Sequence, residues 1–321
     1  MPSSTADLPA SDQLAPAETI VMVRDPGEPM LCIRHVPGSG PSVLYVHGSS
    51  FPAALSMNYR IEGTSWADHL HARGFDVWSF DFPGYGGSER DFPIEPRGAE
   101  PGEIPGRGKE ASRHVERVVR HIQNETGAEK VSIIAHSWGT IPAGLFAGRS
   151  GASVDRLILF GPVGQRDGLV AASASPFLLV TAEDQWKNFQ SGVPVGHGPP
   201  MSRERFDEWA SAYIASDPSS GTRFPPSVRV PAGPDLDIAE AWSGHLAYDP
   251  ALIRSPTMIV RGEWDSITGD SDAAWLVGAM TGVPGGARDC KLGSGAHRMH
   301  IEDNRAALFD AVGAFLLEGG R

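Results

Sequence analysis

Short apolar runs separated by amphipathic stretches dominate the first half of the chain. Two runs, residues 18–23 and 30–35, flank the turn sequence Asp25-Pro26-Gly27 and predict a β-hairpin. Four further runs are almost continuously apolar, a pattern typical of strands that a parallel sheet buries on both faces. These four predicted strands comprise residues 42–47, 75–80, 130–135 and 156–160.

Helical patterns separate these predicted strands. Ser65 and Asp68 have the spacing of a capping box and predict a helix start. Apolar residues at i, i+3, i+4 and i+7 over residues 115–122 predict a second helix, which Gly127 would end. A third predicted helix begins just after Ser137. The alternation of strand and helix predicts an α/β fold with a doubly wound, mostly parallel sheet.

The alternation is interrupted once and then resumes. Residues 165–250 contain aromatic residues, Gly-Pro clusters and short amphipathic pieces, so we expect an inserted, mainly helical lid. The core is then expected to comprise residues 18–164 and 251–321, with a long loop over residues 82–108. Residues 1–17 are rich in Ser, Pro and Ala and predict a disordered tail. The later core elements are predicted as strands 257–261 and 287–292 and helices 272–280 and 304–317.

Charge and composition narrow the range of partners. The chain has 27 basic and 39 acidic side chains, and its net charge of −12 argues against nucleic acid or an anionic membrane as the main partner. No apolar stretch is long enough to span a bilayer, and the N-terminus lacks the features of a secretion signal. The two cysteines, Cys32 and Cys290, cannot form a disulfide framework. We therefore expect a cytoplasmic protein with a small-molecule ligand.

The strongest chemical signal is Ala135-His136-Ser137-Trp138-Gly139, between an apolar run and a helical pattern. A serine on so tight a strand-to-helix turn has a strained backbone and an exposed Oγ. The turn requires small residues two positions to either side, because the strand and helix backbones approach closely, and Ala135 and Gly139 meet that need. The pentapeptide predicts that Ser137 is a nucleophile, although a helix-capping serine would share part of the pattern.

A second signal is the run HGSS, residues 47–50, at the end of an early apolar run. In hydrolases with this serine turn, one N–H of the oxyanion hole comes from such a loop and the other from the residue after the nucleophile. The expected donors are the backbone N–H groups of Ser49 and Trp138, with Ser50 or Phe51 as alternatives to Ser49. Alone, the run would also fit a simple strand-ending turn.

Two further signals follow late predicted strands. Asp265 follows one of these strands, and His297 follows the next. Ligands of open α/β sheets bind at the carboxyl ends of the strands, so both side chains are expected beside Ser137. Glu263 and His300 are the alternatives on the same two loops, and His297 is favoured because it comes first after its strand.

With these residues the chain resembles the α/β-hydrolase superfamily over most of residues 18–321. The family spacing favours Asp265 over Glu263. The resemblance implies Ser137 as nucleophile, His297 as general base and then general acid, and Asp265 as the group that orients the histidine. The matching motifs are His47-Gly48, Asp81-x-Pro83-Gly84-Tyr85-Gly86-x-Ser88, the Ser137 turn, Gly262-x-x-Asp265 and Gly295-x-His297.

The resemblance implies a carboxylesterase-like serine hydrolase that cleaves an ester, thioester, lactone or amide through an acyl-enzyme, with no cofactor and no metal. Relatives with the same triad also cleave C–C bonds or act as aminopeptidases, and the His-Ser-Trp-Gly turn is similar to that of proline iminopeptidases. Epoxide hydrolases and haloalkane dehalogenases are disfavoured, because they have an aspartate where Ser137 stands. A non-catalytic small-molecule binding protein is a remote alternative that the intact triad disfavours.

Aromatic side chains of the expected lid are candidates for the substrate pocket. Together with Trp138 they suggest largely apolar walls and a small-to-medium, uncharged and largely apolar substrate. Packing of the lid onto the core is the competing explanation for these side chains, and the oligomeric state is left open. The candidate substrate-binding residues are Ser50, Phe51, Trp186, Phe189, Trp209 and Trp242.

Overall fold

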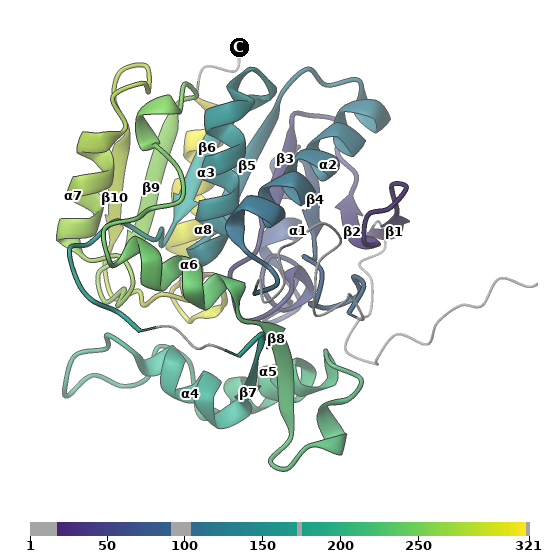
Figure 1. Ribbon diagram of the computed structural model, residues 1–321, viewed down its shortest axis with the longest axis vertical. Coiled ribbons are helices and arrows are strands. Elements are labelled where there is room, and N and C mark those ends of the chain that lie inside the picture. Colours follow the sequence, from purple (N-terminus) through teal and green to yellow (C-terminus); the bar gives the residue numbers. More distant parts are fainter. Residues whose placement is uncertain (1–17, 91–103, 172–174, 319–321) are drawn as a thin grey trace, which may run out of the picture.

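A mostly parallel sheet of eight strands forms the centre of this computed structural model, which describes residues 18–90, 104–171 and 175–318. Its strands are β1 (Thr19–Val23), β2 (Leu31–Val36), β3 (Ser42–Val46), β4 (Asp76–Phe80), β5 (Val131–His136), β6 (Val154–Phe160), β9 (Thr257–Gly262) and β10 (Arg288–Leu292). They lie in the order β1-β2-β4-β3-β5-β6-β9-β10 (Figure 1). The pairs β1–β2 and β2–β4 are antiparallel, and all other neighbours in this sheet are parallel.

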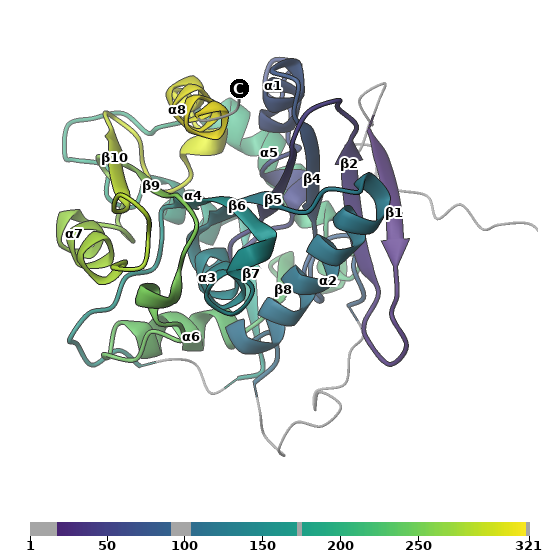
Figure 2. The same ribbon diagram turned by 90° about the horizontal axis from the view of Figure 1, so that it is seen from above.

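Helices cover both faces of the sheet, which confirms the predicted doubly wound architecture (Figure 2). Side chains alternate along β3, so that Val43 and Tyr45 join one apolar cluster while Leu44 and Val46 join the other. Every residue of β3, β4 and β5 is buried, which explains why most of their residues are apolar. The helices are α1 (Trp66–Ala72) and α8 (Arg305–Leu317) on one face, and α2 (Gly108–Thr126), α3 (Thr140–Arg149) and α7 (Asp270–Ala279) on the other.

Local signals in the sequence set the helix ends. The Ser65 Oγ accepts a hydrogen bond from the Asp68 N–H at 3.0 Å, and the Asp68 carboxylate accepts one from the Ser65 N–H at 2.9 Å. This reciprocal capping box begins α1 where the sequence predicts it. Gly127 ends α2 with a φ of +73°, a left-handed conformation that glycine adopts without a steric cost.

Residues 165–250, hereafter the inserted segment, leave the sheet after β6 and return to it at β9. The sequence analysis expects helices here, and the described residues contain three α-helices together with an antiparallel strand pair that it does not expect. Strand β7 reads FLLVT and is only partly buried, so it lacks the alternation that would mark it as a strand. Figure 1 shows α4, α5, β7 and β8 below the main sheet, with α6 nearer the core. The elements are β7 (Phe177–Thr181), α4 (Ala182–Gln190), α5 (Arg203–Ala215), β8 (Ser227–Pro231) and α6 (Gly233–Ala241).

Two segments singled out from the sequence lie wholly or partly outside the described residues. The expected tail, residues 1–17, is one of them, and residues 91–103 of the expected loop over residues 82–108 are the other. The described start of that loop consists of turns that follow β4. Among the helices of the described ranges, none has both the length and the apolar character needed to cross a membrane.

Candidate active site

Ser137 lies on the tight turn between β5 and α3. Its φ of +56° places it in the left-handed region that favours glycine, which is the strained conformation predicted for this turn. A Cβ at Gly139 would lie 2.3 Å from the carbonyl oxygen of His47, so only glycine fits where the turn passes the end of β3. Ala135 is completely buried between the neighbouring strands β3 and β6. Small residues are therefore required at both positions where the sequence has them.

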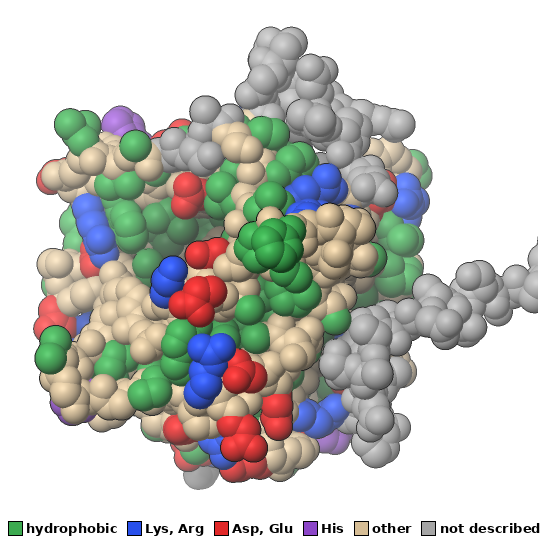
Figure 3. All heavy atoms as spheres, turned by 90° about the horizontal axis from the view of Figure 1, so that it is seen from below, with side chains coloured by type: hydrophobic (Ala, Val, Ile, Leu, Met, Phe, Trp, Pro, Cys, Tyr) green, Lys and Arg blue, Asp and Glu red, His purple; other side chains and the backbone are tan. Residues whose placement is uncertain are grey.

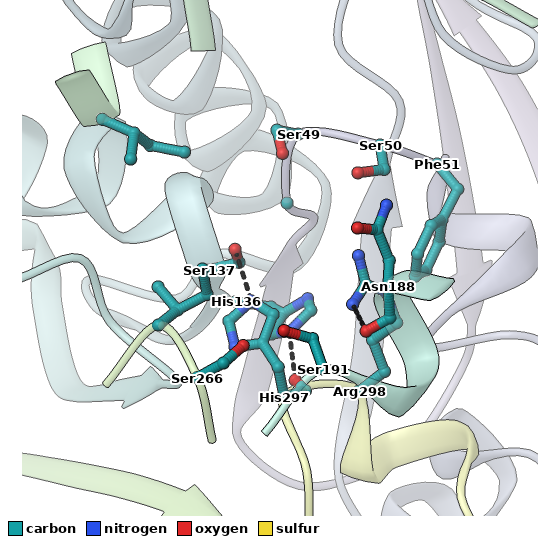
Figure 4. A pocket seen from close by; sticks show the side chains of 13 residues that line it. Ser49, Ser50, Phe51, His136, Ser137, Asn188, Ser191, Ser266, His297 and Arg298 are labelled. Carbon is teal, nitrogen blue, oxygen red and sulfur yellow. Dashed lines mark hydrogen bonds between the residues drawn. The ribbon is translucent and has the colours of Figure 1, made fainter. Parts of the chain in front are cut away.

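Hydrogen bonds join three side chains from separate loops. His297 Nε2 lies 2.7 Å from Ser137 Oγ (Figure 4), and His297 Nδ1 lies 2.9 Å from Asp265 Oδ1. The same carboxylate oxygen accepts hydrogen bonds from the backbone N–H groups of Ile267 at 2.8 Å and Thr268 at 3.0 Å. The three loops follow β5, β9 and β10, whose carboxyl ends lie at one edge of the sheet. The fold thus brings the three predicted residues into one line of contacts.

The charge of Asp265 fixes the tautomer of the histidine. Burial on its own would raise the pKa of this carboxyl, but the interaction with His297 and the hydrogen bonds from two backbone N–H groups outweigh burial and lower the pKa below its usual value. An ionised carboxylate can only accept, so the histidine Nδ1 donates to it. The Nε2 atom is then free to accept the proton of the Ser137 hydroxyl.

The alternative acid and histidine on these loops make other contacts. Glu263 is exposed, and its Oε2 accepts a hydrogen bond from the Ser294 N–H at 3.1 Å. His300 is buried, and its ring nitrogens have no hydrogen-bond partner in the described parts of the chain. Burial, followed by the effects of His297 and Arg298, lowers the pKa of His300 well below its usual range, so the ring is neutral. Neither side chain forms a hydrogen bond to the serine.

Two residues to which the sequence analysis assigns no role hold the loop of His297 in place. Glu302 is buried and accepts hydrogen bonds from the N–H groups of Ala296 at 2.8 Å and Arg298 at 3.1 Å, on either side of the histidine. Burial raises the pKa of Glu302 to about 8, against the effect of these two hydrogen bonds. His136 Nε2 lies 3.0 Å from the His297 carbonyl oxygen and donates to it, because a carbonyl can only accept. Their position in the sequence, beside the nucleophile and at the end of the histidine loop, was the available signal.

The loop after β3 is held in one conformation beside the nucleophile. His47 Nδ1 donates to the Gly48 carbonyl oxygen at 2.7 Å, and its Nε2 accepts from the Phe82 N–H at 3.0 Å. Both contacts require a neutral ring, and burial lowers the pKa of His47 to about 4. The Tyr85 hydroxyl donates to the Ser49 carbonyl oxygen at 2.6 Å, so the turn after β4 fixes the predicted oxyanion loop from the other side.

Trp138 connects the nucleophile turn to the inserted segment. Its indole Nε1 donates to the carboxylate of Asp237 on α6 at 2.8 Å, and the side chain is completely buried. The same carboxylate accepts hydrogen bonds from the Gly108 N–H and the Arg107 Nε, both at 2.6 Å. Burial is the main reason that the pKa of Asp237 lies above its usual value. The indole therefore faces away from the nucleophile, while its backbone N–H remains at the start of the turn.

A cavity of about 120 Å³ opens beside Ser137 and His297 (Figure 4). Most of its lining comes from loops of the core, while Asn188, Ser191 and Ile238 come from the inserted segment. Hydroxyl, amide and guanidinium groups outnumber apolar side chains, so the walls are more polar than the sequence analysis predicts. The lining residues are Gly48, Ser49, Ser50, Phe51, His136, Ser137, Asn188, Ser191, Ile238, Ser266, Ile267, His297 and Arg298.

The four aromatic side chains predicted from the inserted segment do not line this cavity. Phe189 and Trp209 are completely buried and pack edge to face, with ring centroids 5.1 Å apart. Trp186 and Trp242 are half-buried, and each contacts the guanidinium of an arginine. Packing is therefore the role of these rings in the structure, which was the competing explanation. Of the six predicted substrate residues, the two from the core line the cavity.

Charged side chains on one face of the molecule, and groups that could bind a metal ion within the described residues, were compared with this site. On the underside of the molecule, where the inserted segment lies, acidic and basic side chains are interspersed (Figure 3). Over residues 18–90, 104–171 and 175–318, no group of three His, Cys, Asp or Glu side chains is arranged to hold a metal ion.

Comparisons with known proteins identify the family of the chain. The sequence matches the family model of the alpha/beta hydrolase fold over residues 41–303, and no curated protein matches it. A solved serine hydrolase involved in carbazole degradation is 18% identical, with a TM-score of 0.62 over 94% of this chain and 99% of that one. A thioesterase domain from the curacin biosynthetic pathway is also 18% identical, with a TM-score of 0.58 over 92% and 99%. A meta-cleavage product hydrolase from Pseudomonas fluorescens is 16% identical, with a TM-score of 0.61 over 92% and 96%.

Proposed function

The chain belongs to the alpha/beta hydrolase family, and we propose that it is a serine hydrolase that cleaves a carboxylic ester through an acyl-enzyme. The observation that supports this proposal best is the line of contacts from Ser137 through His297 to Asp265. A hydroxyl, a neutral imidazole and an ionised carboxylate in this order are the groups that nucleophilic acyl transfer requires. Thioesters, lactones and amides undergo the same reaction and fall within the proposal.

The proposed reaction begins at the hydroxyl of Ser137. His297 Nε2 accepts the hydroxyl proton as Oγ attacks the substrate carbonyl carbon, and then donates that proton to the leaving group. Asp265 keeps the ring in the tautomer with a free Nε2 and stabilises the imidazolium that forms. In the second half of the reaction, the same Nε2 accepts a proton from water, which attacks the acyl-enzyme and releases Ser137.

We assign the oxyanion hole to the backbone N–H groups of Ser49 and Trp138. The N–H of Trp138 lies at the start of the turn that leads into α3, where the unpaired donors of a helix start carry positive partial charge. The loop of Ser49 is fixed by His47 and Tyr85, so its donor would be in position before the substrate binds.

The cavity suggests a small-to-medium substrate. Phe51, Ile238 and Ile267 would contact its apolar part, and the hydroxyl and amide groups of the lining would contact its polar part. Since α4 and α6 both contribute lining residues, we propose that the inserted segment acts as a lid that determines which substrates fit.

Active-site labelling is the first test of this function. A fluorophosphonate probe is expected to label the wild-type protein at Ser137 and to leave Ser137→Ala unlabelled. p-Nitrophenyl esters of increasing acyl length should then show a rise in kcat/KM from acetate to butyrate or hexanoate, followed by a fall when the cavity is full. Absence of labelling would favour a non-catalytic binding protein, and labelling without turnover of any ester would direct the search to C–C bond and aminoacyl substrates.

A further inference from the structure

The cavity beside Ser137 contains one permanent charge that the proposed reaction does not use. Among the described lining residues, Arg298 is the only permanently charged side chain, and no carboxylate lines the cavity. His136 adds no charge, because burial lowers its pKa well below the usual range. The lining is therefore cationic in a protein whose net charge is −12.

Arg298 has few partners of its own. Its Nη1 donates to the Asn188 carbonyl oxygen at 2.8 Å, and its guanidinium carbon lies 5.4 Å from the centre of the Phe189 ring. Its Nε is buried and has no hydrogen-bond partner within the described residues. A guanidinium has five N–H donors, so the contact with the end of α4 uses only part of its capacity.

Nearby carboxylates do not neutralise this guanidinium directly. Glu302 and Asp265 influence the pKa of Arg298, but neither lies within ion-pair distance of it among the described residues. Glu302 accepts from the backbone N–H of Arg298 rather than from its side chain, and Asp265 is bound to His297. Burial lowers the pKa of Arg298 to about 10, so the side chain remains charged at neutral pH.

Arg298 is partly buried, and its buried Nε has no partner among the described residues; binding an anion there would remove the cost of that unpaired donor. The position of Arg298 suits this purpose, because it directly follows His297 and its backbone is fixed by Glu302. Figure 4 shows Asn188, Ser50 and Phe51 grouped around Arg298 on one side of the cavity, with Ser137 on the other. An anion at the guanidinium would thus belong to the molecule that Ser137 attacks.

We propose that Arg298 binds a carboxylate carried by the substrate, so that the preferred substrates are small esters with one free carboxylate. This inference rests on the proposed function of Ser137. It departs from the sequence analysis, which predicts an uncharged substrate, because Arg298 lines the cavity. The carboxylate and the guanidinium would form two parallel charge-assisted hydrogen bonds.

Matched pairs of charged and neutral esters test whether Arg298 binds a carboxylate of the substrate. Monoethyl adipate against ethyl hexanoate varies the charge on the acyl side, and 3-(butanoyloxy)propanoate against propyl butanoate varies it on the alcohol side. The wild type is expected to show the higher kcat/KM for the charged ester in at least one pair. In Arg298→Met, the charged-to-neutral ratio in that pair should fall about ten- to a hundredfold. Arg298→Lys should keep part of the preference, and Arg203→Met, an exposed position outside the cavity, should keep all of it.

A second measurement needs no variant and no turnover. Hexanoate should protect wild-type Ser137 from fluorophosphonate labelling at a lower concentration than hexanamide, which has the same length and no charge. Equal protection, a wild-type preference for the neutral ester in both pairs, or an unchanged ratio in Arg298→Met would overturn the role of Arg298 while leaving the hydrolase proposal in place. Failure of the probe to label Ser137 at all would instead overturn the proposed function, and this inference with it.

Discussion

The core and the inserted segment meet at the cavity but contribute to it in different ways. Core loops supply Ser137, Asp265 and His297, and each loop directly follows a buried parallel strand. Backbone hydrogen bonds and the strained turn hold these side chains within ångströms of one another. The inserted segment supplies three lining residues, Asn188 from α4, Ser191 from the loop after α4 and Ile238 from α6. Within the described chain, none of the three forms a hydrogen bond to Ser137, Asp265 or the His297 ring.

The two regions are joined by buried polar contacts rather than by a shared sheet. Asp237 on α6 binds Trp138 and Arg107, and Trp209 on α5 donates to the Leu55 carbonyl oxygen at 3.0 Å. The main sheet and the β7–β8 pair are separate. This difference teaches that the core holds all three side chains in the line of contacts from Ser137 to Asp265, whereas the inserted segment only adds to a cavity lining that comes mostly from the core.

We expect the largest loss of activity when the proposed nucleophile is replaced. Ser137→Ala should lower kcat at least about a thousandfold, because the remaining triad members cannot act without it. Ser266→Ala is the matched control, since this serine lines the same cavity, while the hydrogen bonds of the His297 ring in the described chain go to Ser137 and Asp265. Steady-state kinetics on the best ester, with circular dichroism to verify folding, would measure both. A Ser137→Ala variant with more than about a tenth of the wild-type rate would refute the nucleophile assignment.

Replacing His297 should reduce activity nearly as much as replacing Ser137, whereas replacing His300 should not. His297→Ala should abolish turnover, because His297 is the side chain in the described structure that is placed to accept the proton of Ser137. His300→Ala should remain active but melt at a lower temperature, because it empties space beside Phe51, Trp66 and Phe160 in the core. Kinetics and thermal melts of the two variants side by side would decide this. Turnover in the first with loss in the second would reverse the assignment.

Replacing the acid, Asp265, should lower kcat less than replacing Ser137 or His297. Asp265→Asn should lower kcat by about a hundred- to ten-thousandfold, because the amide favours the wrong tautomer of His297. Glu263→Gln is the control, since its exposed side chain only accepts from the Ser294 N–H, which glutamine can also do. Near-normal turnover in Asp265→Asn, combined with loss in Glu263→Gln, would transfer the role to Glu263.

Removing contacts between the core and the inserted segment should lower the stability of the protein more than its catalytic rate. Asp237→Asn should cost about 1–3 kcal/mol in the free energy of unfolding, because one amide oxygen cannot replace the carboxylate toward Trp138, Gly108 and Arg107. Glu240→Gln removes a more exposed partner of the same arginine and should cost less than about 1 kcal/mol. Urea unfolding curves of both variants measure the difference, and equal losses would show that burial of Asp237 is unimportant.

The smallest expected effects are on the preferred acyl length. They distinguish side chains of the inserted segment that only pack, such as Trp186, from those that line the cavity, such as Ile238. Trp186→Ala should change the acyl-length profile by no more than about twofold, because the ring packs on Phe206 and lies outside the cavity. Ile238→Ala should shift the optimum of that profile to longer acyl chains, because this side chain lines the cavity. If Trp186→Ala shifts the optimum and Ile238→Ala does not, the cavity described here is not where the acyl chain binds.

The sequence by itself determined the sheet and the order of its chemical groups. Buried strands must be apolar on both faces, and the serine turn must have small residues at Ala135 and Gly139, so both leave a pattern in neighbouring residues. The capping box at Ser65 and the left-handed Gly127 are equally local, and the structure has both where they were predicted. The predicted Ser137, Asp265 and His297 fall on loops at one edge because parallel strands end together.

Only the tertiary structure decided which side chains line the cavity and what holds the loops. Whether an aromatic ring such as Trp209 fills a core or a pocket depends on what packs against it from distant segments, and the sequence contains no local trace of that choice. The same holds for Asn188 and Arg298, which come from separate regions and meet only after folding. Local patterns record the backbone conformation that a segment needs, whereas the charge and shape of a cavity arise from long-range contacts that no neighbouring residue encodes.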